Sequence, residues 1–214
     1  MSEHKFPTEV IDLPSEGKVY PKESPLSSGK LELKYMTTRE EDILMSENLI
    51  KKGVVIDKLL DSLIVTKGVK QDDLILGDKN AVLVASRILA YGGDYTVEVT
   101  NPNTGEKLTH TFNIADCPFI KLPTGIDGNN FDFELPVSKQ KITFKLLTGK
   151  DERMINEELD KIRKLGTQVI PELTTRLRYL ITSVDGNDEQ STINSFVENM
   201  LSKDSLSLRQ EITK

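Results

Sequence analysis

The chain has 214 residues, of which 37% are hydrophobic and 29% are charged, so it can bury a core and has the polarity of a globular protein. Its formal net charge of −6 argues against binding to nucleic acid, because a phosphate backbone is bound by clustered Lys and Arg. The single cysteine excludes an internal disulfide, and the lack of a long apolar run argues against a signal peptide or a membrane span. We therefore expect a protein that folds in a cytoplasm.

Residues 1–30 form the first predicted segment, an extended arm rich in proline. Closely spaced prolines exclude a long helix and favour extended backbone. The arm also has more apolar side chains than a disordered tail. We interpret it as a docking arm that binds either its own body or a partner, and we expect the body to fold without it. The candidate partner-binding residues are Phe6, Pro7, Val10, Ile11, Leu13, Pro14, Tyr20 and Pro21.

Residues 31–92 are predicted to be mainly helical, after a short strand in which apolar and polar residues alternate. Thr38 and Glu41 have the spacing of a capping box, which predicts a helix that ends near Lys52. The apolar spacing then predicts two more helices, at residues 56–64 and from the N-cap Asp78 to Tyr91.

Residues 93–147 are predicted to form a small antiparallel sheet, because apolar and polar residues alternate along four short stretches. The first two stretches flank the turn 101–105, which reads Asn-Pro-Asn-Thr-Gly. The turn has the frame of a zinc knuckle, with Asn and Thr where the thiolates would stand. It is either an ordinary hairpin turn, which we favour, or a knuckle that has lost its metal, because neither side chain is a good zinc ligand.

Residues 148–214 are predicted to be helical again, beginning with Thr148 and Asp151 as a helix cap. A later helix is expected to continue to Gly186, and no sequence repeat is evident. The fold class is thus predicted to be α+β, with a small antiparallel β-sheet in mid-chain between N- and C-terminal helical segments and an extended N-terminal arm. Residues 31–214 can be interpreted as a single domain.

The residue types needed for catalysis or metal binding are sparse and far apart. His110 is the one internal histidine and Cys117 the one cysteine, and no basic cluster accompanies the thiol. Thr148-Gly149-Lys150-Asp151 lacks the earlier glycine of a phosphate-binding loop. A group of cations between Lys161 and Arg178 is interleaved with acids, which favours a solvated helix face. We expect no catalytic, cofactor-binding or metal-binding residues, and no cofactor.

Several segments resemble the baseplate hub subunits and hub assembly proteins of contractile-tailed phages of the T-even type. The arm carries the pattern Leu-Pro-Ser-x-Gly-x-x-Tyr-Pro at residues 13–21, and the order of the segments carries the resemblance more than any one of them. The other segments are residues 31–44, 55–60, 76–78, 87–92, 147–152 and 204–209. Some relatives have paired cysteines near the hairpin tip, and this chain lacks them.

The resemblance implies a non-enzymatic structural or assembly protein that binds other phage baseplate hub proteins. No nucleic acid, membrane or small-molecule substrate is expected as a partner, and the oligomeric state is left open. The implied location is the host cytoplasm during assembly, with the virion tail baseplate as a further one. Two alternatives stay open: a transient assembly chaperone that is absent from the finished virion, and an enzyme with an unrecognised site.

Overall fold

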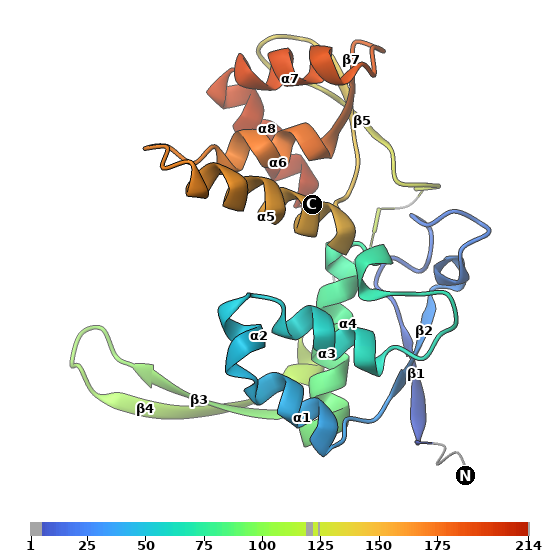
Figure 1. Cartoon of the computed structure of the whole chain (residues 1–214), viewed down its shortest axis with the longest axis vertical. Helices are drawn as coiled ribbons and strands as arrows, with labels where there is room; N and C mark the ends of the chain where they lie inside the picture. The colour runs from blue at the N-terminus through green and yellow to red at the C-terminus, as the bar shows by residue number, and fades with distance from the viewer. Residues whose placement is uncertain (1–5, 119–121, 124, 214) are drawn as a thin grey trace. The chain divides into compact units, whose positions relative to one another are not determined.

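The computed structural model describes residues 6–118, 122–123 and 125–213, so the first five residues of the predicted arm lie outside the described part of the chain (Figure 1). The chain divides into two compact units. Unit 1 consists of Met1–Gln71 and Gly77–Ile126, and unit 2 of Asp72–Leu76 and Asp127–Lys214. The predicted α+β class is confirmed, with eight α-helices and seven strands among the described residues.

Unit 1 begins with the arm, which is a folded part of the unit. Strand β1 (Thr8–Asp12) pairs antiparallel with β2 (Lys30–Lys34), and a short 3₁₀ helix (Pro25–Ser28) lies in the connection between them. Leu13, Val19 and Leu26 are buried. The dense prolines exclude a long helix here, as predicted, but the apolar side chains between them supply core contacts. This burial argues against the expectation that the body folds without the arm.

The helices of unit 1 follow β2. They are α1 (Thr38–Met45), α2 (Glu47–Lys51), α3 (Val55–Leu63) and α4 (Leu76–Tyr91). A 3₁₀ turn at Gln71–Asp73 precedes α4, and its last two residues belong to unit 2. The predicted capping box was shifted by one residue, because the N-cap is Thr37 and its partner is Glu40. Two overlapping pairs of Thr and Glu fit the spacing of a capping box. In the observed pair, the fully buried Glu40 also accepts hydrogen bonds from Lys34 and Ser62. The single predicted helix is interrupted at Ser46, which has extended backbone.

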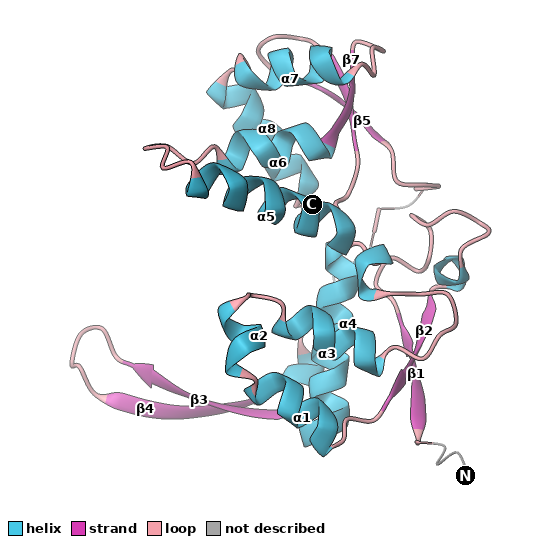
Figure 2. Cartoon of the chain, viewed as in Figure 1, coloured by secondary structure: helices cyan, strands magenta, loops and turns pink. Residues whose placement is uncertain are grey.

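A two-stranded ribbon completes unit 1. Strands β3 (Asp94–Thr100) and β4 (Lys107–Asn113) pair over seven residues each, and a 3₁₀ turn (Ile114–Asp116) follows. Figure 2 shows the strands of unit 1 as two separate pairs, β1–β2 and β3–β4.

Unit 2 packs four helices around a three-stranded sheet. The strands are β5 (Phe131–Glu134), β6 (Lys141–Phe144) and β7 (Ile181–Val184), in the order β5-β6-β7. The helices are α5 (Gly149–Lys164), α6 (Glu172–Leu180), α7 (Gln190–Glu198) and α8 (Ser202–Ile212). The predicted helix to Gly186 was wrong in its last part, because it ends at Leu180 and the chain continues as β7. Pairing with β6 stabilises this β-branched stretch as a strand.

The expectation of one mid-chain sheet was also wrong. The ribbon β3–β4 is a sheet of its own in unit 1, whereas β5 and β6 pair with β7 in unit 2. Alternation of apolar and polar residues identifies strands but does not say which strand pairs with which, and β7 comes from a stretch that reads as helix. The units therefore divide the segment 93–147 between them. That residues 31–214 form one domain stays a prediction.

The two units contain the same β-hairpin. In unit 1, Leu13 follows the first strand and donates its N–H to the carbonyl of Gly29 at 2.8 Å. In unit 2, Leu135 follows the first strand and donates its N–H to the carbonyl of Gln140 at 3.0 Å. Each leucine is buried and precedes a proline, and each acceptor is the residue immediately before the second strand. The hairpins thus have the same register and differ in the length of their connection.

The junction from the second strand to the first helix is repeated as well. Residues 34–40 and 145–151 share the pattern Lys-x-x-Thr-x-x-acid. In both, the lysine Nζ lies 2.8 Å from the carboxylate, which also accepts the threonine N–H at 2.9 Å. The two units thus share this hairpin register and this junction. The shared residues are few and lie at a spacing that varies between elements, so the absence of a sequence repeat stays a prediction.

Candidate protein-binding surfaces

The arm is attached to unit 1 through a buried carboxylate. Asp78, the third residue of α4, accepts hydrogen bonds from the Ser15 N–H at 3.0 Å and from the Ser15 hydroxyl at 2.6 Å. The Tyr20 hydroxyl donates to the same carboxylate at 2.6 Å. Asp78 was predicted to be the helix N-cap, and this was wrong, because α4 begins two residues earlier and the side chain accepts from the arm. A buried carboxylate requires several donors, and the arm supplies them.

The glycine of the arm's Leu-Pro-Ser-x-Gly pattern is needed for a close approach of two backbone segments. Gly17 has a φ of +78°, and a Cβ at this position would lie 2.4 Å from the carbonyl oxygen of Ser27. Gly29 meets the backbone of Glu16 in the same way. These contacts explain why the pattern has glycine where the arm folds back on itself.

The eight residues predicted to bind a partner divide into three groups in the structure. The side chains of Leu13 and Tyr20 are buried in unit 1. Ile11 and Pro14 are half-buried, and Phe6, Pro7, Val10 and Pro21 are exposed. The Lys34 Nζ lies 5.3 Å from the centre of the Phe6 ring. The structure therefore shows the arm docked on its own body, and binding of a partner by its exposed residues stays a prediction.

The buried carboxylates of both units are occupied by structural hydrogen bonds. Burial would raise the pKa of Glu40, but hydrogen bonds from Lys34, Thr37 and Ser62 outweigh it and hold the pKa at about 2. Burial likewise opposes ionisation of Asp151, whose pKa is nevertheless lowered by Lys145 and Thr148. A carboxylate that is held ionised by fixed donors is poorly suited to exchange protons with a substrate.

Unit 2 has a counterpart of the Asp78 site. Asp204, the third residue of α8, accepts the backbone N–H groups of Val137 and Ser138 at 2.8 and 3.0 Å. Burial opposes ionisation, but these backbone bonds lower the pKa of Asp204. In both units a backbone N–H donor lies two residues after the leucine of the hairpin, at Ser15 and at Val137. Sequence reasoning missed this role of the two aspartates, which lie 63 and 67 residues from their partners.

The remaining candidates for chemistry are separate surface or capping groups. His110 is exposed on β4, and Cys117 is exposed at the end of the following 3₁₀ turn. Thr148 and Asp151 form the helix cap of α5, as predicted. At the hairpin tip, the Asn101 side chain accepts the N–H of Asn103, as in an ordinary Asx turn. No group of three or more His, Cys, Asp or Glu that could hold a metal ion occurs within residues 6–118, 122–123 and 125–213.

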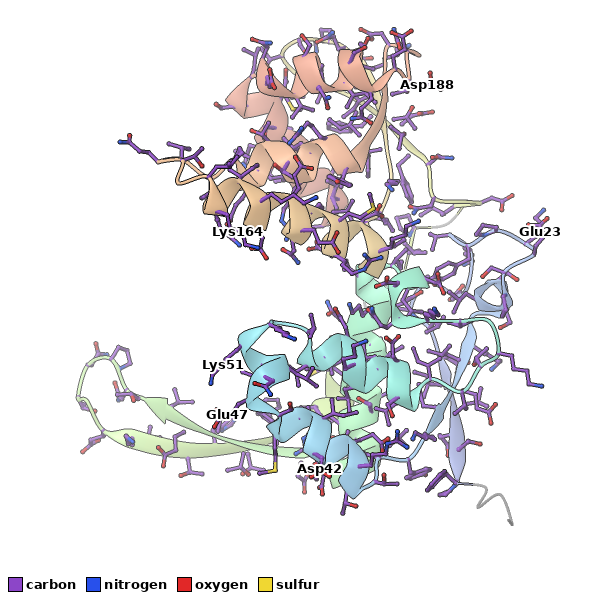
Figure 3. All side chains as sticks on the ribbon, in the orientation of Figure 1. Glu23, Asp42, Glu47, Lys51, Lys164 and Asp188 are labelled. Atoms are coloured by element: carbon purple, nitrogen blue, oxygen red, sulfur yellow. The ribbon has the colours of Figure 1, made fainter. Side chains whose placement is uncertain are left out.

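Carboxylates neutralise much of the cation group in unit 2. Arg163 contacts Asp160 and Glu172 at 2.9 and 2.8 Å, and Arg176 and Arg178 pair with glutamates of α5. This arrangement is typical of a solvated helix face. The charged surface of unit 1 is similar, as Glu47 and Lys51 illustrate on α2 (Figure 3). Exposed pairs of this kind contribute less than about 1 kcal/mol to stability.

The ribbon β3–β4 presents four large apolar side chains that are exposed on unit 1. The exposed fractions are 42% for Tyr95, 50% for Val99, 55% for Leu108 and 39% for Phe112. Tyr95 and Phe112 also line a cavity of about 380 Å³, whose other walls are mainly apolar side chains of α1, α3 and α4. The sequence predicted two alternating strands here, but it did not predict that their apolar side chains are exposed. Alternation along the two strands gives no signal of this exposure, because it does not say what covers the apolar face.

Within the described ranges, none of the helices combines the length and the apolar character that a membrane span requires. The surfaces and buried groups described above define a class of protein. It is an α+β protein in which buried carboxylates stabilise the fold and the apolar face of a β-ribbon is exposed.

The family model of the T4 bacteriophage base plate protein matches residues 7–209. Because this match spans nearly the whole chain, the chain belongs to the family of T4-type phage baseplate proteins. No curated protein and no solved structure matches it.

Proposed function

We propose that the chain is a non-enzymatic protein of the baseplate hub that acts by binding other hub proteins during assembly. Membership of the baseplate family supports the setting. The resemblance of the arm and first helices to hub proteins supports the hub in particular. The single observation that carries the binding role is the exposed apolar face of the ribbon, because soluble proteins rarely leave such a patch without a partner.

The buried carboxylates support the absence of catalysis. Asp78, Glu40, Asp151 and Asp204 are each held by donors from the same unit, and His110 and Cys117 are not drawn into a cluster with them. An active site requires side chains that contact a substrate, whereas these carboxylates are hydrogen-bonded to other residues of their own unit.

Co-expression with the other hub proteins of the same phage tests this function. We expect the chain to co-purify with at least one of them and to elute from a sizing column as a complex of fixed stoichiometry. If every hub protein elutes separately from the chain, the proposed function is wrong.

A second question is whether the protein remains in the finished virion or leaves after assembly. Mass spectrometry of purified virions would detect a hub component and would miss a chaperone that leaves after assembly. We favour the component, because a surface fixed on a folded unit suits a permanent interface.

A further inference from the structure

The ribbon β3–β4 has no counterpart among the features that the two units share. Both units have the hairpin, the Lys-x-x-Thr-x-x-acid junction and a helix with a buried aspartate at its third position. The core of unit 2 closes without an equivalent ribbon among the described residues. The shared features thus occur in unit 2 without such a ribbon, which points to another reason for its presence in unit 1.

The ribbon has one polar and one apolar face. Its pairing aligns Tyr95 with Phe112, Val97 with His110 and Val99 with Leu108, so these side chains share one face. The opposite face holds the pairs Thr96–Thr111 and Glu98–Thr109. Such a pattern normally means that the apolar face is covered, yet no residue of β4 is buried.

Both edges of the ribbon are also free, because each strand pairs only with the other in the described part of the chain. A two-stranded ribbon by itself is marginally stable in water, and a third strand or a packed apolar surface stabilises it. An extended segment of another protein could supply both at once, by pairing with an edge and by packing side chains on the apolar face.

The apolar face continues into the cavity of unit 1. Tyr95 and Phe112 belong to both, and their rings lie 5.7 Å apart in an edge-to-face arrangement. The cavity of about 380 Å³ falls within the roughly 300–1,000 Å³ of typical binding pockets. An apolar anchor side chain from a partner would be desolvated there, as binding hot spots usually are.

Charge decides between a second copy and a different protein. The ribbon has three carboxylates, Asp94, Glu98 and Glu106, and one cation, Lys107, all on its polar face or at its tip. Arg87 adds one cation at the wall of the cavity, so the ribbon and cavity together have a net charge of −1. The whole chain has a net charge of −6. A second copy would bring like charges together, whereas a partner with Lys or Arg beside its apolar residues would be attracted.

We propose that the apolar face of the ribbon, together with the adjoining cavity, is the docking surface for an extended segment of a hub protein that presents apolar side chains flanked by basic residues. This inference rests on the proposed function and names the part of the chain that performs it.

Two matched variants test the proposal. Leu108→Lys adds a positive charge to the apolar face, and Thr109→Lys adds the same charge to the neighbouring residue on the opposite face. The affinity of each for every purified hub protein of the same phage is measured, one hub protein at a time. We expect Leu108→Lys to lose roughly tenfold or more in affinity, and Thr109→Lys to stay within about threefold of the wild type.

A second, uncharged variant guards against a folding defect. Val99→Thr keeps the shape and the strand preference of valine while removing apolar surface. It should weaken binding and leave the thermal midpoint unchanged. A large fall in the midpoint would show that the chain itself covers this face, which would overturn the proposal.

The other outcomes are distinct. If the wild type binds a hub protein and Leu108→Lys binds it equally well, the docking surface is wrong and the proposed function stands. If the wild type forms a dimer that Leu108→Lys converts to a monomer, the occupant is a second copy and the proposal is overturned. If no hub protein binds the wild type, the proposed function falls and this inference falls with it.

Discussion

Removal of the Asp78 carboxylate is the sharpest test of how the arm is held. In Asp78→Ala, the Ser15 N–H and hydroxyl and the Tyr20 hydroxyl all lose this acceptor. A hydrogen bond to a charged group contributes about 1.5–3 kcal/mol, so three of them contribute several kcal/mol. The cost of burying the carboxylate offsets part of this sum. We expect a net loss of about 3–5 kcal/mol in the free energy of unfolding.

Urea unfolding followed by tyrosine fluorescence measures this loss. The chain has no Trp and five Tyr, and Tyr179 is the only one of these in unit 2. The signal therefore reports mainly on unit 1. In a double-mutant cycle, Tyr20→Phe should destabilise the wild type and have much less effect in the Asp78→Ala background. An Asp78→Ala protein within about 0.5 kcal/mol of the wild type would refute the reasoning.

Three further predictions concern other parts of the chain. Gly17→Ala should lower the free energy of unfolding by about 2 kcal/mol or more, because its Cβ would clash with backbone atoms. The control Gly105→Ala, which has a similar φ but open space around the Cβ, should lower it by about 1 kcal/mol, and urea titration compares the two variants. Glu40 has a pKa lowered from 4.5 to about 2, so its contribution to stability is present above pH 4.5 and is lost as the pH falls toward 2. Glu40→Gln should lower the free energy of unfolding by on the order of 3 kcal/mol at pH 7 and flatten the pH dependence of the urea midpoint between these pH values. An unchanged pH profile would contradict the assignment. Cys117 lines the cavity beside the ribbon and is the one cysteine, so a bound hub protein should slow its alkylation by N-ethylmaleimide, and an unchanged rate in the complex would argue that the cavity stays open.

Local patterns predicted those elements whose stabilising interactions are close in sequence. The cap formed by Thr148 and Asp151 spans three residues, and the helix Val55–Leu63 follows directly from its apolar spacing. The ribbon β3–β4 was also predicted, because strong turn residues lie between two alternating stretches. In each case the sequence within about ten residues contains the reason for the structure.

Features that depend on distant partners could not be predicted in the same way. Ile181–Val184 reads as part of a helix, and its pairing with β6 makes it a strand. The two registers of the capping box at Thr37 and Thr38 differ only in which glutamate is buried. Burial of Glu40 depends on Lys34 and Ser62, and Ser62 lies 22 residues away. Tertiary contacts, and not local preference, decide such cases.

The docking arm combines a feature that local patterns predicted with one that depends on a distant partner. Its composition correctly indicated extended backbone with apolar anchors, but it did not distinguish a partner from the arm's own unit. The structure shows the arm held on its own unit through Asp78, which reads as an ordinary helix N-cap in the sequence. The likeness of the two junctions could have been found from the shared Lys-x-x-Thr-x-x-acid spacing at residues 34–40 and 145–151.

The most direct test of the central claim, that this baseplate protein helps to build the hub by binding hub proteins, uses a phage in which its gene is interrupted. Electron micrographs of the lysate are compared with those of the same phage supplied with the wild-type chain or with Leu108→Lys. We predict baseplates that lack a complete hub in the mutant, rescue by the wild type and poor rescue by Leu108→Lys. Complete, infectious tails in the absence of the chain would contradict the account.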